Sequence, residues 1–199
     1  MKKKEILVFG ASGFIGTNII RKLTKNNHKV TAVTRNVHQK GIRIKTQGNF
    51  GYLNVIEANI FDIDKLKLII NSAEICINLV GILHESGKNT FNNIHNNFPS
   101  VLSKICKEKN VEQFIHISAL GIDQASEKSK YAKSKLEGEK KIIENFPKAT
   151  ILRPSVVYGN EDNFTNLFMG LLSKFPIFPL YYNGKTKFTP IHVSDLTDI

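Results

Sequence analysis

Three side chains of this sequence have the types and the spacing needed to move a proton on or off a carbonyl or alcohol oxygen. Tyr131 and Lys135 form a Y-x-x-x-K pattern in a segment with helical periodicity, so both lie on one helix face. The ammonium there favours the phenolate, which a tyrosine with an ordinary pKa of about 10 needs for acid/base work near neutrality. Ser118, after the apolar run 114–117, is a hydroxyl that can polarise a substrate carbonyl. A Y-x-x-x-K pattern by itself is common on solvated helix faces, so the neighbouring motifs decide whether it indicates an active site.

That context includes a glycine turn near the amino terminus. Gly10, Gly13 and Gly16 form a G-x-x-G-x-x-G motif between the apolar run 6–9 and a helical pattern. Between a strand and a helix, such glycines allow a tight bend and a close approach to a pyrophosphate, which the helix amino terminus can hold. We therefore predict a dinucleotide site, although a tight βα connection without a ligand is the alternative. Its predicted residues are Gly10, Ser12, Gly13, Phe14, Ile15 and Gly16.

The residue after the second predicted strand bears on which dinucleotide is bound. Arg35 stands where NAD-selective enzymes place an Asp or Glu for the ribose 2′-hydroxyl. A guanidinium can pair with an adenosine 2′-phosphate, so the sequence favours NADP(H), with NAD(H) as the alternative. An Arg35 that simply points to water is the other interpretation. Further candidates for cofactor contact follow the third and fourth predicted strands: Asn59, Leu79, Val80 and Gly81.

The periodicity of the chain predicts the elements that position these residues. Short apolar runs alternate with amphipathic stretches, which indicates βαβ units and an α/β fold with a Rossmann-type doubly wound parallel sheet. The predicted strands are Glu5–Phe9, Lys29–Thr34, Leu53–Glu57, Ile75–Leu79, Gln113–Ile117 and Thr150–Leu152. The predicted helices lie near 14–26, 63–71, 91–109 and 129–145. The segment 35–52, rich in Gly, Asn and Gln, is predicted to be a long loop or irregular crossover.

The alternation of short apolar runs with amphipathic stretches does not continue after Pro154. A helix is predicted from Asn163 to Lys174, and the prolines of the segment 175–179 break regular structure, as expected where a lid or a small substrate subdomain begins. We therefore expect a dinucleotide-binding domain over 1–160. A partial substrate-binding or lid region over 161–199 is expected to continue in a longer protein.

Composition narrows the class of protein. The net charge of +11 would suit nucleic acid, an anionic membrane or phosphorylated ligands, but the lysines are spread along amphipathic helices without an Arg-rich tract. A solvated surface is favoured, and nucleic-acid binding is not expected. Cys76 and Cys106 lack C-x-x-C spacing, which predicts buried reduced thiols and a cytoplasmic location. His116 and His192 are expected to make structural hydrogen bonds, and no metal site is predicted.

Several of these segments together resemble an extended-type short-chain dehydrogenase/reductase. They are the glycine turn, Ser118, Tyr131 with Lys135, the segment LRPSVVYG at 152–159 and the segment FTPIHVSDL at 188–196. Within that superfamily, which includes the NAD-dependent epimerase/dehydratase family, the segments 77–81 and 114–120 are most similar to the atypical branch that contains the NAD(P)H-binding accessory subunit of respiratory complex I.

The resemblance implies roles for individual residues. It implies Tyr131 as acid/base, Lys135 on the nicotinamide ribose and Ser118 on the substrate, and it adds Pro154 to the cofactor contacts. Two features depart from the pattern. The longer serine-containing stretch that precedes the tyrosine in nucleotide-sugar enzymes is lacking, and His95, beside Asn96, stands where many relatives have an asparagine.

Two functions of different classes follow from the resemblance. One is an NADP(H)-dependent oxidoreductase or epimerase/dehydratase that acts on a small carbonyl, alcohol or sugar substrate. The other is a non-catalytic NADPH-binding structural or assembly subunit, peripheral to the inner membrane at a respiratory NADH:ubiquinone oxidoreductase complex. The resemblance also implies homo-oligomers, paired through the helices 91–109 and 129–145.

Overall fold

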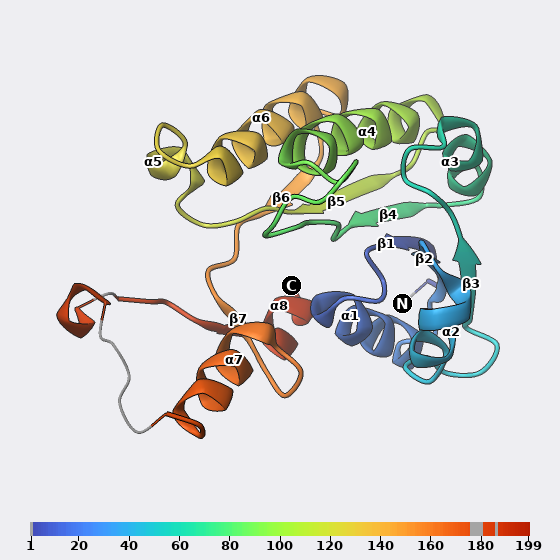
Figure 1. Cartoon of the computed structure of the whole chain (residues 1–199). Helices are drawn as coiled ribbons and strands as arrows, with labels where there is room; N and C mark the ends of the chain where they lie inside the picture. The colour runs from blue at the N-terminus through green and yellow to red at the C-terminus, as the bar shows by residue number, and fades with distance from the viewer. Residues whose placement is uncertain (1, 176–180, 186) are drawn as a thin grey trace. The chain divides into compact units, whose positions relative to one another are not determined.

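The computed structural model describes residues 2–175, 181–185 and 187–199 (Figure 1). The chain forms two compact units, Met1–Arg153 and Pro154–Ile199. The division falls just before the expected boundary near 160. Pro176 and Pro179, which are predicted to break regular structure, lie outside the described residues.

The first unit is built on a six-stranded parallel sheet in the order β3-β2-β1-β4-β5-β6. Its strands are β1 (Glu5–Phe9), β2 (Lys29–Thr34), β3 (Leu53–Glu57), β4 (Ile75–Asn78), β5 (Gln113–Ile117) and β6 (Thr150–Leu152). The predicted doubly wound sheet is confirmed. The order reverses between β1 and β4, and the carboxyl ends of strands at such a switch point are where ligands bind in open α/β sheets.

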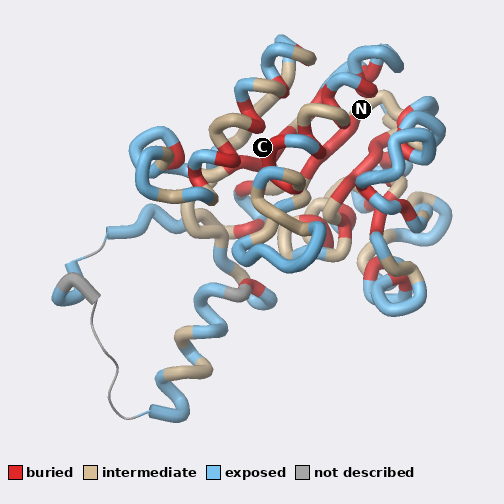
Figure 2. The backbone as a smooth tube through the Cα atoms, turned by 45° about the horizontal axis from the view of Figure 1, so that its top comes forward, coloured by how far each residue is buried: buried red, intermediate tan, exposed pale blue. Residues whose placement is uncertain are grey.

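Helices cover both faces of this sheet (Figure 1). One face packs against α3, α4 and α6, and the other against α1 and α2. The helices of this unit are α1 (Phe14–Lys25), α2 (Val37–Lys45), α3 (Ile63–Ile70), α4 (Phe98–Glu108), α5 (Ile122–Ala125) and α6 (Lys130–Asn145). Figure 2 shows buried residues along the strands and on the helix faces that pack against them.

The two cysteines lie in the core of the first unit. Cys76 on β4 and Cys106 on α4 are both buried and free, as the sequence predicts. Burial and the neighbouring Cys106 thiol raise the pKa of Cys76 well above its ordinary value. A thiol held in the protonated form is a weak nucleophile, so these residues are part of the packing.

The prediction of a loop or irregular crossover over 35–52 is wrong in its first half. Residues 37–45 form α2, because the Asn36 side chain accepts a hydrogen bond from the Gln39 backbone N–H and so caps the helix. Ile44 is fully buried against the sheet and anchors the helix there. Gly41 and the polar composition weaken the helical signal in the sequence, and tertiary packing outweighs them.

The predicted helix over 91–109 is also more irregular than expected. Its first part is a π-helix, η1 (Asn92–Asn97), which continues directly into α4. The extra residue per turn places Ile94, His95 and Asn96 at buried positions. π-helical turns of this kind are frequent at functional sites, and η1 packs against α6, which carries the predicted tyrosine and lysine.

The second unit contains a two-stranded parallel sheet and short helices. The strands β7 (Val157–Tyr158) and β8 (Ile191–His192) pair in parallel. The remaining elements are α7 (Asn163–Leu172), the 3₁₀ turn η2 (Tyr181–Gly184) and α8 (Val193–Asp198). The buried Asp162 carboxylate caps α7 by accepting hydrogen bonds from the Thr165 backbone and side chain. The helix predicted to begin at Asn163 is confirmed, and it ends at Leu172.

Candidate active site

The glycine turn joins β1 to α1 and depends on the absence of side chains at two positions. Gly10 has a φ of +78°, and a Cβ there would lie 2.9 Å from the Leu79 carbonyl carbon. A Cβ on Gly16 would collide with the Gly10 carbonyl oxygen. These contacts hold the amino terminus of α1 against the turn and the end of β4. Gly13 is the N-cap, no side chain caps the helix, and its first turn holds no acidic residue.

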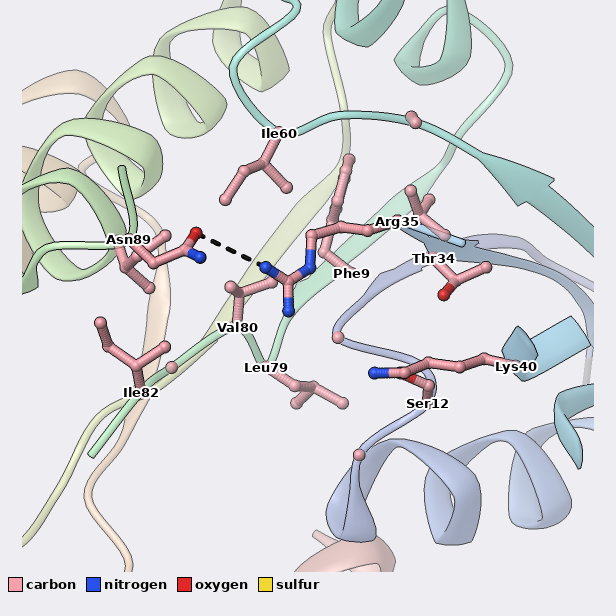
Figure 3. A pocket seen from close by; sticks show the side chains of 16 residues that line it. Phe9, Ser12, Thr34, Arg35, Lys40, Ile60, Leu79, Val80, Ile82 and Asn89 are labelled. Carbon is pink, nitrogen blue, oxygen red and sulfur yellow. Dashed lines mark hydrogen bonds between the residues drawn. The ribbon is translucent and has the colours of Figure 1, made fainter. Parts of the chain in front are cut away.

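A pocket of about 220 Å³ opens at the carboxyl edge of the sheet, beside this turn (Figure 3). The turn, the ends of β1 to β4 and the segment after β4 all contribute to it. Its lining residues are Phe9, Gly10, Ser12, Gly13, Val33, Thr34, Arg35, Lys40, Ala58, Ile60, Leu79, Val80, Gly81, Ile82, Asn89 and Ile94. Ala58, Ile60, Val80 and their neighbours give it an apolar floor. Arg35 and Lys40 add positive charge to its lining.

Two cations line the pocket, Arg35 directly after β2 and Lys40 on α2. The sequence predicts Arg35 as a cofactor contact. It does not indicate Lys40, because that residue lies on α2, in a segment predicted to be a loop. The Lys40 side chain extends into the pocket on the side of the glycine turn, and the Arg35 guanidinium extends toward Asn89 on the opposite side (Figure 3). Both side chains are exposed, so their charges are available to a bound anion.

Some predicted cofactor residues do not line the pocket. Phe14, Ile15 and Gly16 form the first turn of α1, where Gly16 packs against the backbone of Gly10 and Ala11. The Asn59 side chain accepts a hydrogen bond from the Phe61 backbone N–H, and its neighbours line the pocket instead. Pro154 opens the second unit. Their contacts with a cofactor stay predictions.

The predicted reacting residues Ser118, Tyr131 and Lys135 are not among the residues that line this pocket, but Lys135 lies next to its backbone. Lys135 is buried in the middle of α6, and its Nζ donates a hydrogen bond to the Ile117 carbonyl oxygen, 3.1 Å away. A Cβ on Gly81 would lie 3.6 Å from that Nζ, so the lysine abuts the backbone that lines the pocket. Ser118 directly follows Ile117, and its buried hydroxyl has no partner.

The electrostatics of the pair do not by themselves produce a tyrosinate. Burial raises the pKa of Tyr131 above its usual value. Burial also lowers the pKa of Lys135 to about 8, against a smaller opposing effect of the Glu139 carboxylate. Tyr131 packs edge-on against the rings of Phe91 and His95, with centroids 5.8 Å and 5.1 Å away. The phenol is therefore held in place by aromatic packing and carries its proton near neutral pH.

His95 is held by hydrogen bonds at both ring nitrogens. Its Nε2 accepts from the Ile82 backbone N–H at 3.1 Å, so Nδ1 carries the proton. That N–H donates to the Ser134 hydroxyl at 3.0 Å, and the hydroxyl donates in turn to the Tyr131 carbonyl oxygen at 2.7 Å. Burial, and next the Lys135 charge, lower the pKa of His95 to about 3. It is a neutral structural link between the segment after β4 and α6.

A second buried histidine has one nitrogen unpartnered. Asn78 accepts from the Val80 backbone N–H with its Oδ1, so its amide nitrogen donates to His116 Nδ1 at 3.0 Å. The proton of His116 is therefore on Nε2, which has no partner. Burial, and next the charges of Lys135 and His95, lower its pKa well below the ordinary value. The expected structural hydrogen bonding of His116 is made at Nδ1 alone, and its unpartnered N–H lies on β5, two residues before the unpartnered Ser118 hydroxyl that follows the strand.

Arg153 has a structural role at the end of the first unit. Its guanidinium forms a two-pronged contact with the buried Glu139 carboxylate of α6 and bonds Asp123 of α5 at 2.6 Å. Arg153 therefore links α6 to α5 and to the end of β6. Over the described ranges no cluster of three or more His, Cys, Asp and Glu side chains has the arrangement of a metal site. Within the same residues, no helix combines the length and apolar character that a bilayer crossing requires.

The doubly wound sheet, the glycine turn and the serine, tyrosine and lysine beside it define a protein of the short-chain dehydrogenase/reductase type. The chain belongs to the family described as the RmlD substrate binding domain, which matches residues 3–180. The resemblance to the epimerase/dehydratase superfamily is thus confirmed.

Curated relatives support the similarity to the complex I branch. The chain is 33% identical over 191 residues to the mitochondrial NADH dehydrogenase [ubiquinone] 1 alpha subcomplex subunit 9 of Mus musculus, covering 96% of this chain and 50% of the relative. It is 26% identical over 192 residues to the ceramide reductase of Caulobacter vibrioides, covering 96% of this chain and 57% of that protein. The chain spans about half the length of the curated relatives it matches.

Solved structures share the fold. A UDP-glucuronic acid 4-epimerase of Bacillus cereus, in complex with UDP-glucuronic acid and NAD, superimposes with a TM-score of 0.77 at 24% identity. The similarity covers 97% of this chain and 70% of the epimerase chain. At this identity it shows the fold alone.

Proposed function

We propose that the first unit binds a nicotinamide dinucleotide in the pocket at the carboxyl edge of β1 to β4, with preference for NADP(H). The observation that carries this proposal is the glycine turn at the pocket rim. The amino terminus of α1 has no side-chain cap and no acidic residue in its first turn, so its N–H groups and dipole are free for a pyrophosphate. The space that a Cβ at Gly10 would fill is needed for the bend that exposes them.

The preference for NADP(H) rests on Arg35 and Lys40. Both cations extend into the pocket from the side of β2 and α2, and its described lining residues include no Asp or Glu that would accept a 2′-hydroxyl. A phosphate between a guanidinium and an ammonium gains two charge-assisted contacts, whereas a hydroxyl gains little from either. The epimerase that shares the fold holds NAD, so the choice must come from this chain's own rim residues.

Equilibrium titration of the purified chain with NADPH and NADH, followed by nicotinamide fluorescence, tests this proposal. Arg35→Ser is expected to weaken NADPH binding by about 10- to 100-fold, the value of a charged hydrogen bond, and NADH binding by less than about threefold. Arg21→Ser is the matched control, because Arg21 is an exposed arginine of α1 that does not line the pocket. A wild-type chain that binds neither dinucleotide would refute the proposal.

For the chemistry, we assign Tyr131 as the acid/base, Ser118 as a donor to the substrate oxygen and Lys135 as the group that stabilises the phenolate and contacts the cofactor ribose. A bound nicotinamide would supply or accept the hydride. The unpartnered Ser118 hydroxyl is available to a substrate oxygen, and Lys135 has one hydrogen bond for three N–H donors. The relative named ceramide reductase supports an oxidoreductase reaction.

A single-turnover assay tests whether the chain is an oxidoreductase with Tyr131 as acid/base. Oxidation of bound NADPH is followed against a panel of carbonyl compounds and nucleotide sugars. Tyr131→Phe is expected to slow the reaction by about 10²- to 10⁴-fold, since a positioned acid/base contributes that much, with cofactor affinity unchanged. Tyr52→Phe is the control, because the Tyr52 ring packs beside the Lys3 ammonium and not beside His95 or Lys135, and it is expected to keep the wild-type rate.

A second candidate function is that of an NADPH-binding subunit without turnover. The 33% identity to a mitochondrial complex I subunit favours it, as does the engagement of both His95 nitrogens, which leaves this residue no proton to exchange. In this second candidate function, the chain associates with a respiratory complex at the inner membrane. Tight NADPH binding with no oxidation by any member of the panel would favour it, and turnover that depends on Tyr131 would exclude it.

A further inference from the structure

A short hairpin follows β4 and borders the pocket opposite the glycine turn. Ser86 and Asn89 exchange backbone hydrogen bonds of 3.1 Å and 2.9 Å around Gly87, whose φ is +53°. The hairpin is braced at its base. The Glu85 carboxylate accepts from the Phe91 backbone N–H at 2.6 Å, and the Asn93 amide donates to the Lys88 carbonyl oxygen at 2.9 Å. Asn89 is therefore presented to the pocket by a fixed backbone.

The Asn89 side chain meets Arg35 across the pocket. Arg35 Nη1 donates to Asn89 Oδ1 over 3.5 Å, although the two residues lie 54 positions apart. Figure 3 shows the guanidinium extended over the pocket toward this amide, away from the glycine turn. The contact is long and exposed, so it orients the guanidinium without holding it tightly.

The chemistry of the amide matters for what Arg35 can then bind. A neutral carbonyl oxygen leaves the full positive charge of the guanidinium available. A phosphate makes shorter and stronger charge-assisted hydrogen bonds and therefore displaces the amide or shares the guanidinium with it. A carboxylate in the same place would pair with Arg35 permanently and would repel a phosphate.

We infer that Asn89 is a specificity-determining residue of the dinucleotide site, which orients Arg35 across the pocket and keeps it available for the 2′-phosphate. This inference rests on the proposed binding of NADP(H). It adds that selectivity depends on the hairpin after β4 as well as on the residues after β2. The identity of the side chain at position 89 then sets the ratio of the NADPH and NADH affinities.

The test is a charge change that keeps the shape of the side chain. Asn89→Asp is expected to weaken NADPH binding by about 10- to 100-fold and NADH binding by less than about threefold, in the same fluorescence titration. Asn89→Ser removes the amide that orients Arg35 without adding charge, and it is expected to weaken NADPH binding by about three- to tenfold and to leave NADH binding within about threefold of wild type. Asn54→Asp adds the same charge at an exposed position of β3 outside the pocket and is the matched control.

A double-mutant cycle shows whether the effect passes through Arg35. In an Arg35→Gln background, Asn89→Asp is expected to lose most of its effect on NADPH, because the partner is gone. An Asn89→Asp variant that retains its melting temperature and the wild-type ratio of affinities would overturn the inference and leave the proposed function intact. An equal loss for both dinucleotides would overturn it too. If the wild-type chain binds neither dinucleotide, the proposed function fails first.

Discussion

Lys135 is an ammonium group buried beneath the carboxyl edge of the sheet, with one hydrogen bond to the Ile117 carbonyl oxygen. The two histidines nearest to it are neutral, because burial and its own charge lower their pKa values. The cost of burying the charge is partly offset by Glu139, which Arg153 holds in place. Burying an ammonium costs free energy of desolvation, so a lysine buried in this way is a candidate functional residue. The pKa of Lys135 gives a direct test of its environment.

Lys135 is expected to make stability rise with pH above about 8. Its pKa is about 8 in the folded chain against an ordinary 10.5, so between these values the unfolded chain binds more protons and the folded state gains stability as pH rises. The difference in unfolding free energy between wild type and Lys135→Met should change by up to about 3 kcal/mol from pH 8 to 10.5, measured by urea denaturation. Lys133→Met, an exposed lysine of the same helix, should show no such change.

At the level of elements, the close packing of η1 on α6 positions the predicted reacting residues. Gly138 of α6 lies directly against the His95 carbonyl oxygen of η1. The missing side chain allows the two helices to approach, and the approach places the His95 ring against Tyr131 and Ser134. The π-helical turn and the glycine therefore act together, because either a regular helix or a larger residue would move the ring.

Gly138→Ala is expected to lower the unfolding free energy by at least about 2 kcal/mol, since a methyl group would overlap the His95 carbonyl oxygen and force the helices apart. Thermal and urea denaturation measure this loss. Gly170→Ala in α7 is the control, because no described atom lies within 4 Å of the added methyl group. It is expected to be neutral or to stabilise by up to about 1 kcal/mol. A Gly138→Ala chain as stable as wild type would contradict the packing described.

At the scale of the whole molecule, the pocket joins parts of the chain that are distant in sequence. The glycine turn, the β2–α2 connection, the end of β3 and the hairpin after β4 each contribute lining residues. A ligand that contacts all four binds the folded first unit and not the unfolded chain. Its binding free energy is then added to the stability of that unit.

NADPH is accordingly expected to raise the melting temperature in a concentration-dependent way. At 100 times its Kd it should add about 2.7 kcal/mol to the unfolding free energy of the first unit. NADH at the same concentration should add less, and Arg35→Ser should remove most of the difference. Differential scanning calorimetry measures these shifts. A melting temperature insensitive to both dinucleotides would argue against a site in this unit.

Local patterns in the sequence determined the sheet, the glycine turn and the tyrosine–lysine spacing. Five of the six predicted strands have the observed bounds, and the fourth ends one residue earlier, at Asn78. These features depend on neighbouring residues, since buried parallel strands appear as apolar runs and the glycine turn is contiguous. Arg35 was found in the same way, by its place after a strand.

Only the tertiary structure decided the formation of α2, the protonation of the buried histidines and the partner of Arg35, because these features depend on contacts between residues distant in sequence. α2 forms through the Asn36 cap and the burial of Ile44, and it brings Lys40 to the pocket. The protonation of His95 and His116 follows from partners on other elements, Ile82 and Ser134 for one and Asn78 for the other. The meeting of Arg35 with Asn89 joins residues 54 positions apart, which no local pattern indicates.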